Sequence, residues 1–102
     1  MAILCITTLP EGVTLEQALA VSKEVGGAEE PPAGGISHTM IVDGGRVKSF
    51  DVWESEEAMN TFAEQRLIPA IMKVMAQFGM EGPPPPPDQQ IFEAHDAMGA
   101  AG

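Results

Sequence analysis

A histidine and an aspartate, His38 and Asp51, lie on either side of the sequence Asp43-Gly44-Gly45. An Asp-Gly-Gly segment between two stretches of alternating apolar residues is a strong signal for a tight β-hairpin. If the turn consists of the two glycines, pairing back along both strands places His38 directly opposite Asp51. The Cβ atoms of such a cross-strand pair lie about 4.5–5.5 Å apart.

A carboxylate beside an imidazole fixes the tautomer of the ring and raises its basicity. These are the properties that a general base requires. We therefore expect His38 to accept a proton and Asp51 to orient the imidazole. The alternative is a structural pair near the sheet edge, and a bulged turn would shift the register and separate the two residues.

The same register predicts an apolar wall around His38. Ile36 is expected opposite Trp53, and Met40 is expected on the same face of the sheet. Together with Phe62 from the following helix, these residues are the candidate contacts for a hydrophobic ligand. The alternative for Trp53, the one tryptophan of the chain, is a place in the core or in a subunit interface.

Hydrophobic patterning predicts strands over residues 2–8, 36–42, 46–54 and 89–95, and helices over residues 15–25 and 56–78. Thr14, with Gln17 three residues later, predicts a capping box for the first helix. The stripe that recurs at helical spacing along this helix consists of Leu15, Ala18, Leu19, Ser22 and Val25. Ser55 is the expected N-cap of the second helix, and Pro69 is expected to bend or split that helix.

The order strand, helix, strand, strand, helix, strand predicts a ferredoxin-like α+β fold, with a four-stranded antiparallel sheet and both helices on one face. We expect one domain over residues 1–97 and a frayed tail over residues 98–102. Both alternating sets of the second and third strands contain apolar side chains. A second subunit is therefore expected to cover the other face, which predicts a homodimer formed through the sheet.

Composition excludes several classes of function. Fifteen acidic residues against five basic ones give a net charge of −10, which disfavours binding to nucleic acid and to anionic membranes. The one cysteine cannot form an internal disulfide, and the two histidines fall on separate strands, so no metal site is expected. With no signal peptide and no apolar run of about 20 residues, we expect a cytoplasmic protein.

Four segments carry a resemblance to a known family: residues 35–38, 43–45, 51–58 and 66–69. Together they resemble the dimeric α+β barrel superfamily, and within it the antibiotic-biosynthesis-monooxygenase-like branch, over residues 2–95. The resemblance implies two sheets paired across a dimer. It also implies action on hydrophobic, aromatic or polyketide-like molecules without metal or flavin. Two features depart from the family: the chain has no tyrosine, and Phe62 stands where haem-active relatives present a histidine.

Two hypotheses of function follow. The first is a cofactor-independent oxygenase, isomerase or cyclase in which His38 removes a proton, Asp51 orients it and Trp53 stacks on the substrate. In the oxygenase version, the resulting carbanion itself reduces dioxygen. The second is a dimer that binds a ligand or serves assembly without catalysis. The His38–Asp51 pair favours catalysis, whereas the absence of tyrosine and of a second polar pair favours the alternative.

Overall fold

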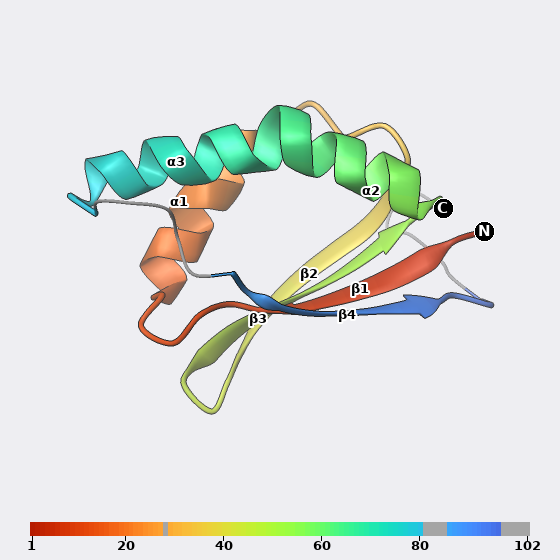
Figure 1. Ribbon diagram of the computed structural model, residues 1–102, viewed down its shortest axis with the longest axis horizontal. Coiled ribbons are helices and arrows are strands. Elements are labelled where there is room, and N and C mark those ends of the chain that lie inside the picture. The colour runs from red at the N-terminus through yellow and green to blue at the C-terminus, as the bar shows by residue number, and fades with distance from the viewer. Residues whose placement is uncertain (28, 81–85, 97–102) are drawn as a thin grey trace.

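The computed structural model describes residues 1–27, 29–80 and 86–96. One antiparallel sheet has the strand order β2-β3-β1-β4, and the helices lie on one side of it (Figure 1). This arrangement confirms the predicted ferredoxin-like fold, while the expected frayed tail, residues 98–102, lies outside the described residues. The elements are β1 (Ile3–Thr8), α1 (Leu15–Val25), β2 (Gly35–Asp43), β3 (Arg46–Trp53), α2 (Glu56–Phe62), η1 (Ala63–Leu67), α3 (Ile68–Gln77) and β4 (Asp88–Glu93).

Both predicted helix caps are present. The Thr14 hydroxyl accepts a hydrogen bond from the Gln17 backbone N–H at 3.1 Å, and the Gln17 side chain accepts one from the Thr14 backbone N–H at 3.1 Å. Gly26 ends α1 in the left-handed conformation. The Ser55 hydroxyl accepts from the Ala58 backbone N–H at 3.1 Å and starts α2. In the part of the chain that the structure describes, no helix is both long and apolar enough to cross a membrane.

Pro69 changes the winding of the second helical segment rather than dividing it. Proline lacks the backbone N–H, and its ring presses on the carbonyl four residues earlier in an ordinary α-helix. The preceding stretch, η1, is a π-helix in which the Ile68 N–H donates to the Ala63 carbonyl, five residues back. The wider turn leaves α2, η1 and α3 in one continuous helical path (Figure 1).

The β2–β3 hairpin has the predicted register over most of its length. Both turn glycines have positive φ, 59° for Gly44 and 80° for Gly45, as a two-residue type I′ turn requires. His38 lies opposite Asp51. The expectation that Ile36 pairs with Trp53 is wrong, because a bulge between Gly35 and Ser37 places Gly35 opposite Trp53 and leaves Ile36 without a partner in β3.

Strand alternation gives the sheet two distinct faces. Trp53 belongs to the helix-facing side, since its ring centroid lies 5.1 Å from that of Phe62 in α2. Asp51 of β3 and its neighbours in the adjacent strands, Cys5 and His38, share this face by register. The core residues are small or medium in size apart from Trp53: Ile3, Cys5, Ala18, Val47, Trp53, Ala70 and Val74.

The outer face of the sheet has an apolar centre formed by Leu4 and Ile6 of β1 and by Phe50 and Val52 of β3. Phe92 of β4 lies opposite Leu4 and is 49% exposed. The helices occupy the other side of the sheet (Figure 1). This face is therefore the surface that a second copy would cover under the predicted homodimer.

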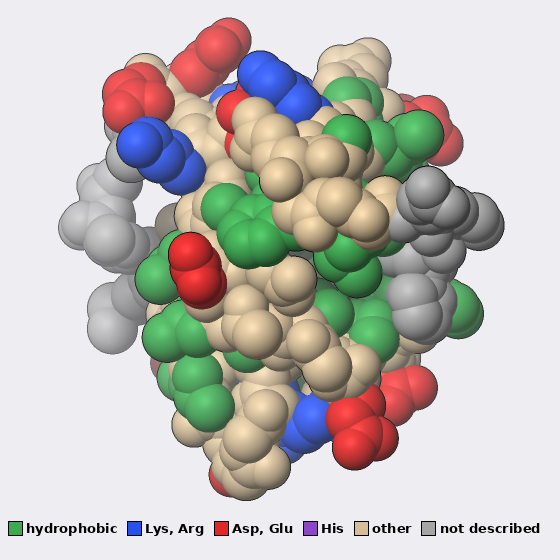
Figure 2. Space-filling view, turned by 90° about the vertical axis from the view of Figure 1, so that its left-hand side faces the viewer, with side chains coloured by type: hydrophobic (Ala, Val, Ile, Leu, Met, Phe, Trp, Pro, Cys, Tyr) green, Lys and Arg blue, Asp and Glu red, His purple; other side chains and the backbone are tan. Residues whose placement is uncertain are grey.

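Apolar side chains also reach the surface at one end of the molecule, where α1 begins and α3 ends. Figure 2 shows hydrophobic side chains gathered across the middle of this end, with most charged side chains above and below them. Leu15 and Leu19 of α1 and Phe78 after α3 are exposed. Of the apolar stripe predicted for α1, Ala18 is buried as expected, whereas Leu15 and Leu19 are exposed.

The apolar centre of the outer face generates a prediction about assembly. We expect the wild-type chain to be a homodimer and Val52→Lys to be a monomer, because a buried unpaired charge opposes association. Size-exclusion chromatography with light scattering at micromolar concentration measures both masses. Glu64→Lys, an exposed change on η1, is the control and should stay dimeric. A monomeric wild type would contradict the prediction.

Candidate functional site

The side chains of His38 and Asp51 meet across the β2–β3 hairpin. Nδ1 of His38 is within hydrogen-bond distance of Oδ1 of Asp51. The residues share the helix-facing side of the sheet because each two-residue step along a strand returns to the same face. The His38 side chain is 51% exposed, and that of Asp51 is 20% exposed. The imidazole is thus accessible to solvent while its partner is mostly enclosed.

The second oxygen of the same carboxylate is also occupied. The Ser49 hydroxyl donates a hydrogen bond to Oδ2 of Asp51 at 3.2 Å. Ser49 and Asp51 are two residues apart in β3 and therefore project from the same face. One carboxylate oxygen faces the serine and the other faces the histidine.

The pairing changes the acid–base behaviour of His38. The hydrogen bond to Asp51 raises the pKa of His38 above its ordinary value of 6.5, partial burial opposes this shift, and the negative charge of Asp51 adds to it. When neutral His38 donates from Nδ1 to the carboxylate, its proton resides on Nδ1 and Nε2 is left as the acceptor. The pair can therefore offer a basic nitrogen to a bound molecule.

Cys5 lies beside this pair but has the properties of a packing residue. It is opposite Asp51 in β1 and only 2% exposed, and its sulfur lies 3.6 Å from the Thr7 hydroxyl. Burial raises the pKa of the Cys5 thiol, the Thr7 contact opposes this, and the charges of Asp51 and Glu56 raise it further. A thiol held protonated in this way is a poor nucleophile.

The predicted apolar wall is only partly assembled around His38. Met40 has the expected position, since it lies opposite Ser49 and two residues from His38 on the same face. Trp53 is 6% exposed and packs against Phe62 with the rings tilted by 42°. Ile36 occupies the bulge and departs from the predicted register.

Two pockets are described, and neither is lined by His38 or Asp51. The larger pocket, of about 390 Å³, lies where the loop before β2 meets α2. Phe62 and Arg66 line it. The other lining residues are Pro32, Ala33, Gly34, Glu54, Ser55, Glu57, Ala58, Thr61 and Gln65. A Cβ on Gly34 would lie 2.6 Å from that of Ala58. The loop and the helix are therefore closely packed at this pocket.

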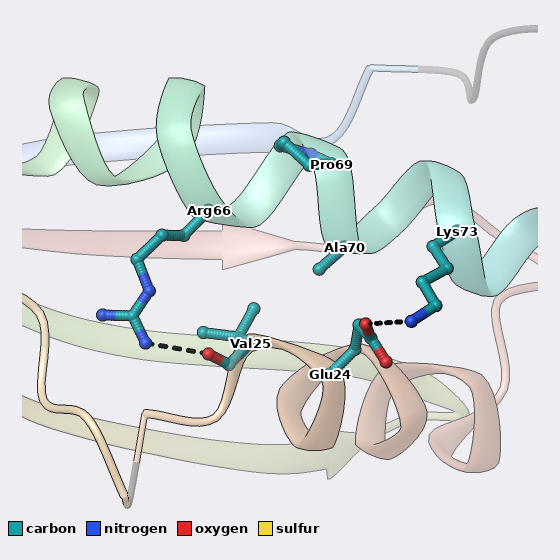
Figure 3. A pocket seen from close by; sticks show the side chains of 6 residues that line it. All are labelled: Glu24, Val25, Arg66, Pro69, Ala70 and Lys73. Carbon is teal, nitrogen blue, oxygen red and sulfur yellow. Dashed lines mark hydrogen bonds and ion pairs between the residues drawn. The ribbon is translucent and has the colours of Figure 1, made fainter.

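The second pocket, of about 260 Å³, lies between α1 and the η1–α3 segment (Figure 3). Its basic side chains already have partners: Arg66 donates to the Val25 carbonyl at 2.8 Å, and Lys73 pairs with Glu24 at 2.7 Å. Arg66 also lies over the Phe62 ring, 5.6 Å from its centroid. These contacts fasten the end of α1 to the second helical segment.

Sequence patterning missed the roles of Ser49 and Arg66. The signal for Ser49 was available, because a serine two residues before the aspartate on a strand faces the same way. Arg66 had no such signal, since the π-helical turn that carries it could not be derived from helical periodicity.

The other histidine is separate from this site. The strand predicted to reach His95 ends at Glu93, so His95 lies two residues beyond β4, and its Nε2 is 3.8 Å from a Glu93 carboxylate oxygen. Among residues 1–27, 29–80 and 86–96, no group of three or more His, Cys, Asp or Glu side chains is placed to hold a metal ion.

Comparison with solved structures places the fold among known proteins. The cofactor-independent oxygenase SnoaB from Streptomyces nogalater matches with a TM-score of 0.63 at 14% identity, covering 94% of this chain and 95% of that one. The ActVA-Orf6 monooxygenase from Streptomyces coelicolor, solved with Nanaomycin D, matches with a TM-score of 0.59 at 22% identity, covering 95% and 90%.

A Nitrosomonas europaea protein provisionally assigned as an antibiotic biosynthesis monooxygenase matches with a TM-score of 0.63 at 8% identity, covering 94% of this chain and all of that one. No protein-family model and no curated protein matches the chain. At these identities the likeness shows a shared fold, and it confirms the structural resemblance predicted from the sequence.

The raised pKa of His38 predicts how stability depends on pH. A group whose pKa is higher in the folded state stabilises the fold fully below its unfolded pKa, 6.5 for histidine, and this stability is lost as the pH rises through the folded value. Urea unfolding of wild type and Asp51→Asn should therefore differ more at about pH 6 than at about pH 9. An equal difference at both pH values would show that the pair does not couple in solution.

Proposed function

We propose that this protein is an enzyme that acts on a hydrophobic, aromatic or polyketide-like molecule without a metal or a flavin, with His38 as the general base. The observation that carries the proposal is the His38–Asp51 hydrogen bond on the helix-facing side of the sheet, with the imidazole still accessible. Neighbours that share the fold include a cofactor-independent oxygenase, which supports the same kind of chemistry.

The first step is removal of a proton from an acidic carbon. A C–H between two aromatic rings that are conjugated to a carbonyl gives a delocalised carbanion, so a base of moderate strength suffices. His38 would take the proton on Nε2, while Asp51 stabilises the imidazolium through Nδ1. Met40 and the Trp53–Phe62 pair would provide apolar contacts for the rest of the substrate.

For an oxygenase, the carbanion then transfers electrons to dioxygen and forms a carbon–oxygen bond. The resulting peroxide takes the proton from His38. Loss of water, which removes the second C–H proton and breaks the oxygen–oxygen bond, leaves a carbonyl group. One methylene and one dioxygen thus give one ketone and one water. Isomerisation or cyclisation would use the same first step without dioxygen.

A specific observation favours the second candidate, a ligand-binding or assembly dimer without catalysis. The two described pockets lie away from His38, and the outer face of the sheet has an apolar centre. In that case the His38–Asp51 pair would stabilise the hairpin. Ligand affinity of the folded protein would then not depend on either residue.

The proposal predicts the effects of substitutions on turnover. With a tricyclic anthrone as probe, oxygen uptake should fall about 10²–10⁴-fold in His38→Ala, because the proton acceptor is lost. Oxygen uptake should fall less in Asp51→Asn, because the imidazole remains. Activity should survive treatment with a chelator and the absence of added flavin. An oxygen electrode measures the oxygen uptake, and absorbance measures the quinone formed from the anthrone.

His95→Ala is the matched control, because His95 is exposed and lies at the end of β4, outside the proposed site. It should retain wild-type turnover. Equal turnover in wild type and His38→Ala, with both proteins folded, would overturn the role of His38 as the base. A wild-type protein that oxidises the probe no faster than buffer alone would favour the non-catalytic dimer.

A further inference from the structure

Asp51 lies between two strand neighbours and could turn its carboxylate toward either. On β1 its neighbour is Cys5, and on β2 it is His38. The Cys5 sulfur is within 3.6 Å of the Thr7 hydroxyl, and Oδ1 of Asp51 faces His38 instead. The contact with His38 holds Oδ1, and the placement of Oδ2 depends on a second contact.

We propose that Ser49 is a positioning residue that fixes the Asp51 carboxylate so that its other oxygen meets His38. This inference rests on the proposed function in so far as His38 acts as a base. Ser49 Oγ donates to Oδ2 at 3.2 Å, and the half-buried serine is held by its place in β3, between Thr7 and Met40 in the adjacent strands. Because β3 has a hydrogen-bonded strand on each side, the backbone at Ser49 is held in place.

The physical consequence concerns the tautomer of His38. With Oδ2 held by Ser49, Oδ1 accepts from Nδ1, and neutral His38 keeps its proton on Nδ1. Removing the serine hydroxyl frees the carboxylate to rotate about its terminal torsion, which has a broad, soft energy profile. The Nδ1–H···Oδ1 contact is then made for a smaller fraction of the time, and part of the population shifts its proton to Nε2. Only the tautomer with its proton on Nδ1 offers Nε2 as a base.

The test is ¹⁵N NMR of His38 in Ser49→Ala, which reports the tautomer directly and requires no substrate. The Nε2–H population should increase, and the pKa of His38 should fall toward its ordinary value. Turnover of the anthrone probe should fall roughly 10-fold in kcat with little change in KM, the factor expected when a hydrogen bond to a charged group is lost.

Ser49→Thr keeps the hydroxyl and should restore the wild-type tautomer and pKa. Ser37→Ala is the matched control, because Ser37 is one residue from His38 and lies opposite Val52 on the outer face. Ser37→Ala should change neither the tautomer population nor the pKa of His38. An unchanged ¹⁵N spectrum in Ser49→Ala would overturn the role of Ser49. This result is independent of turnover, so a failure of the proposed function would show separately, as His38→Ala with wild-type activity.

Discussion

The register of the β2–β3 hairpin is the constraint on which the candidate site depends. Two glycines with positive φ close the turn and place Asp43 opposite Arg46. From that point, the two-residue period of a strand determines every cross-strand pair up to the bulge. His38 meets Asp51 for this reason, and a shift of one residue would send the two side chains to opposite faces. The acid–base pair is thus a consequence of the turn.

Sequence patterning predicted the parts of the structure that follow from local rules. The capping box at Thr14, the cap at Ser55 and the His38–Asp51 pairing all depend on residues close to one another or on a short turn. The bulge after Gly35 could not be predicted in this way. It occurs where β2 begins, beside the loop that packs closely on α2, so tertiary contacts decide it.

In the helices, too, local features were predictable and features set by tertiary packing were not. Periodicity predicted a stripe containing both Ala18 and Leu19, yet α1 buries Ala18 and leaves Leu19 exposed, because the angle at which a helix meets its neighbours is not encoded in its own period. Pro69 was correctly identified as a perturbation, but its effect is a π-helical turn that keeps the helix continuous. That turn carries Arg66, which bonds to Val25 of α1 and lies over Phe62. Long-range contacts of this kind are set by packing.

The fold that this chain shares with known oxygenases and the chemistry proposed for it rest on different observations. Oxygenases of known structure have this fold at 14% and 22% identity, and folds of this kind support many functions. The case for catalysis therefore rests on His38, Asp51 and Ser49, whose contacts form one continuous chain across two strands. The Trp53–Phe62 pair would contribute hydrophobic contact, and its burial also stabilises the junction of sheet and helix.

The central claim, that His38 removes a proton from carbon, is tested most directly by hydrogen–deuterium exchange without oxygen. In anaerobic D₂O, the methylene protons of an anthrone can be followed by NMR while no oxidation takes place. The wild-type protein should accelerate their exchange, and His38→Ala should leave the rate at that of buffer alone. Exchange that is equally fast with wild type and with His38→Ala would contradict a catalytic role for this histidine.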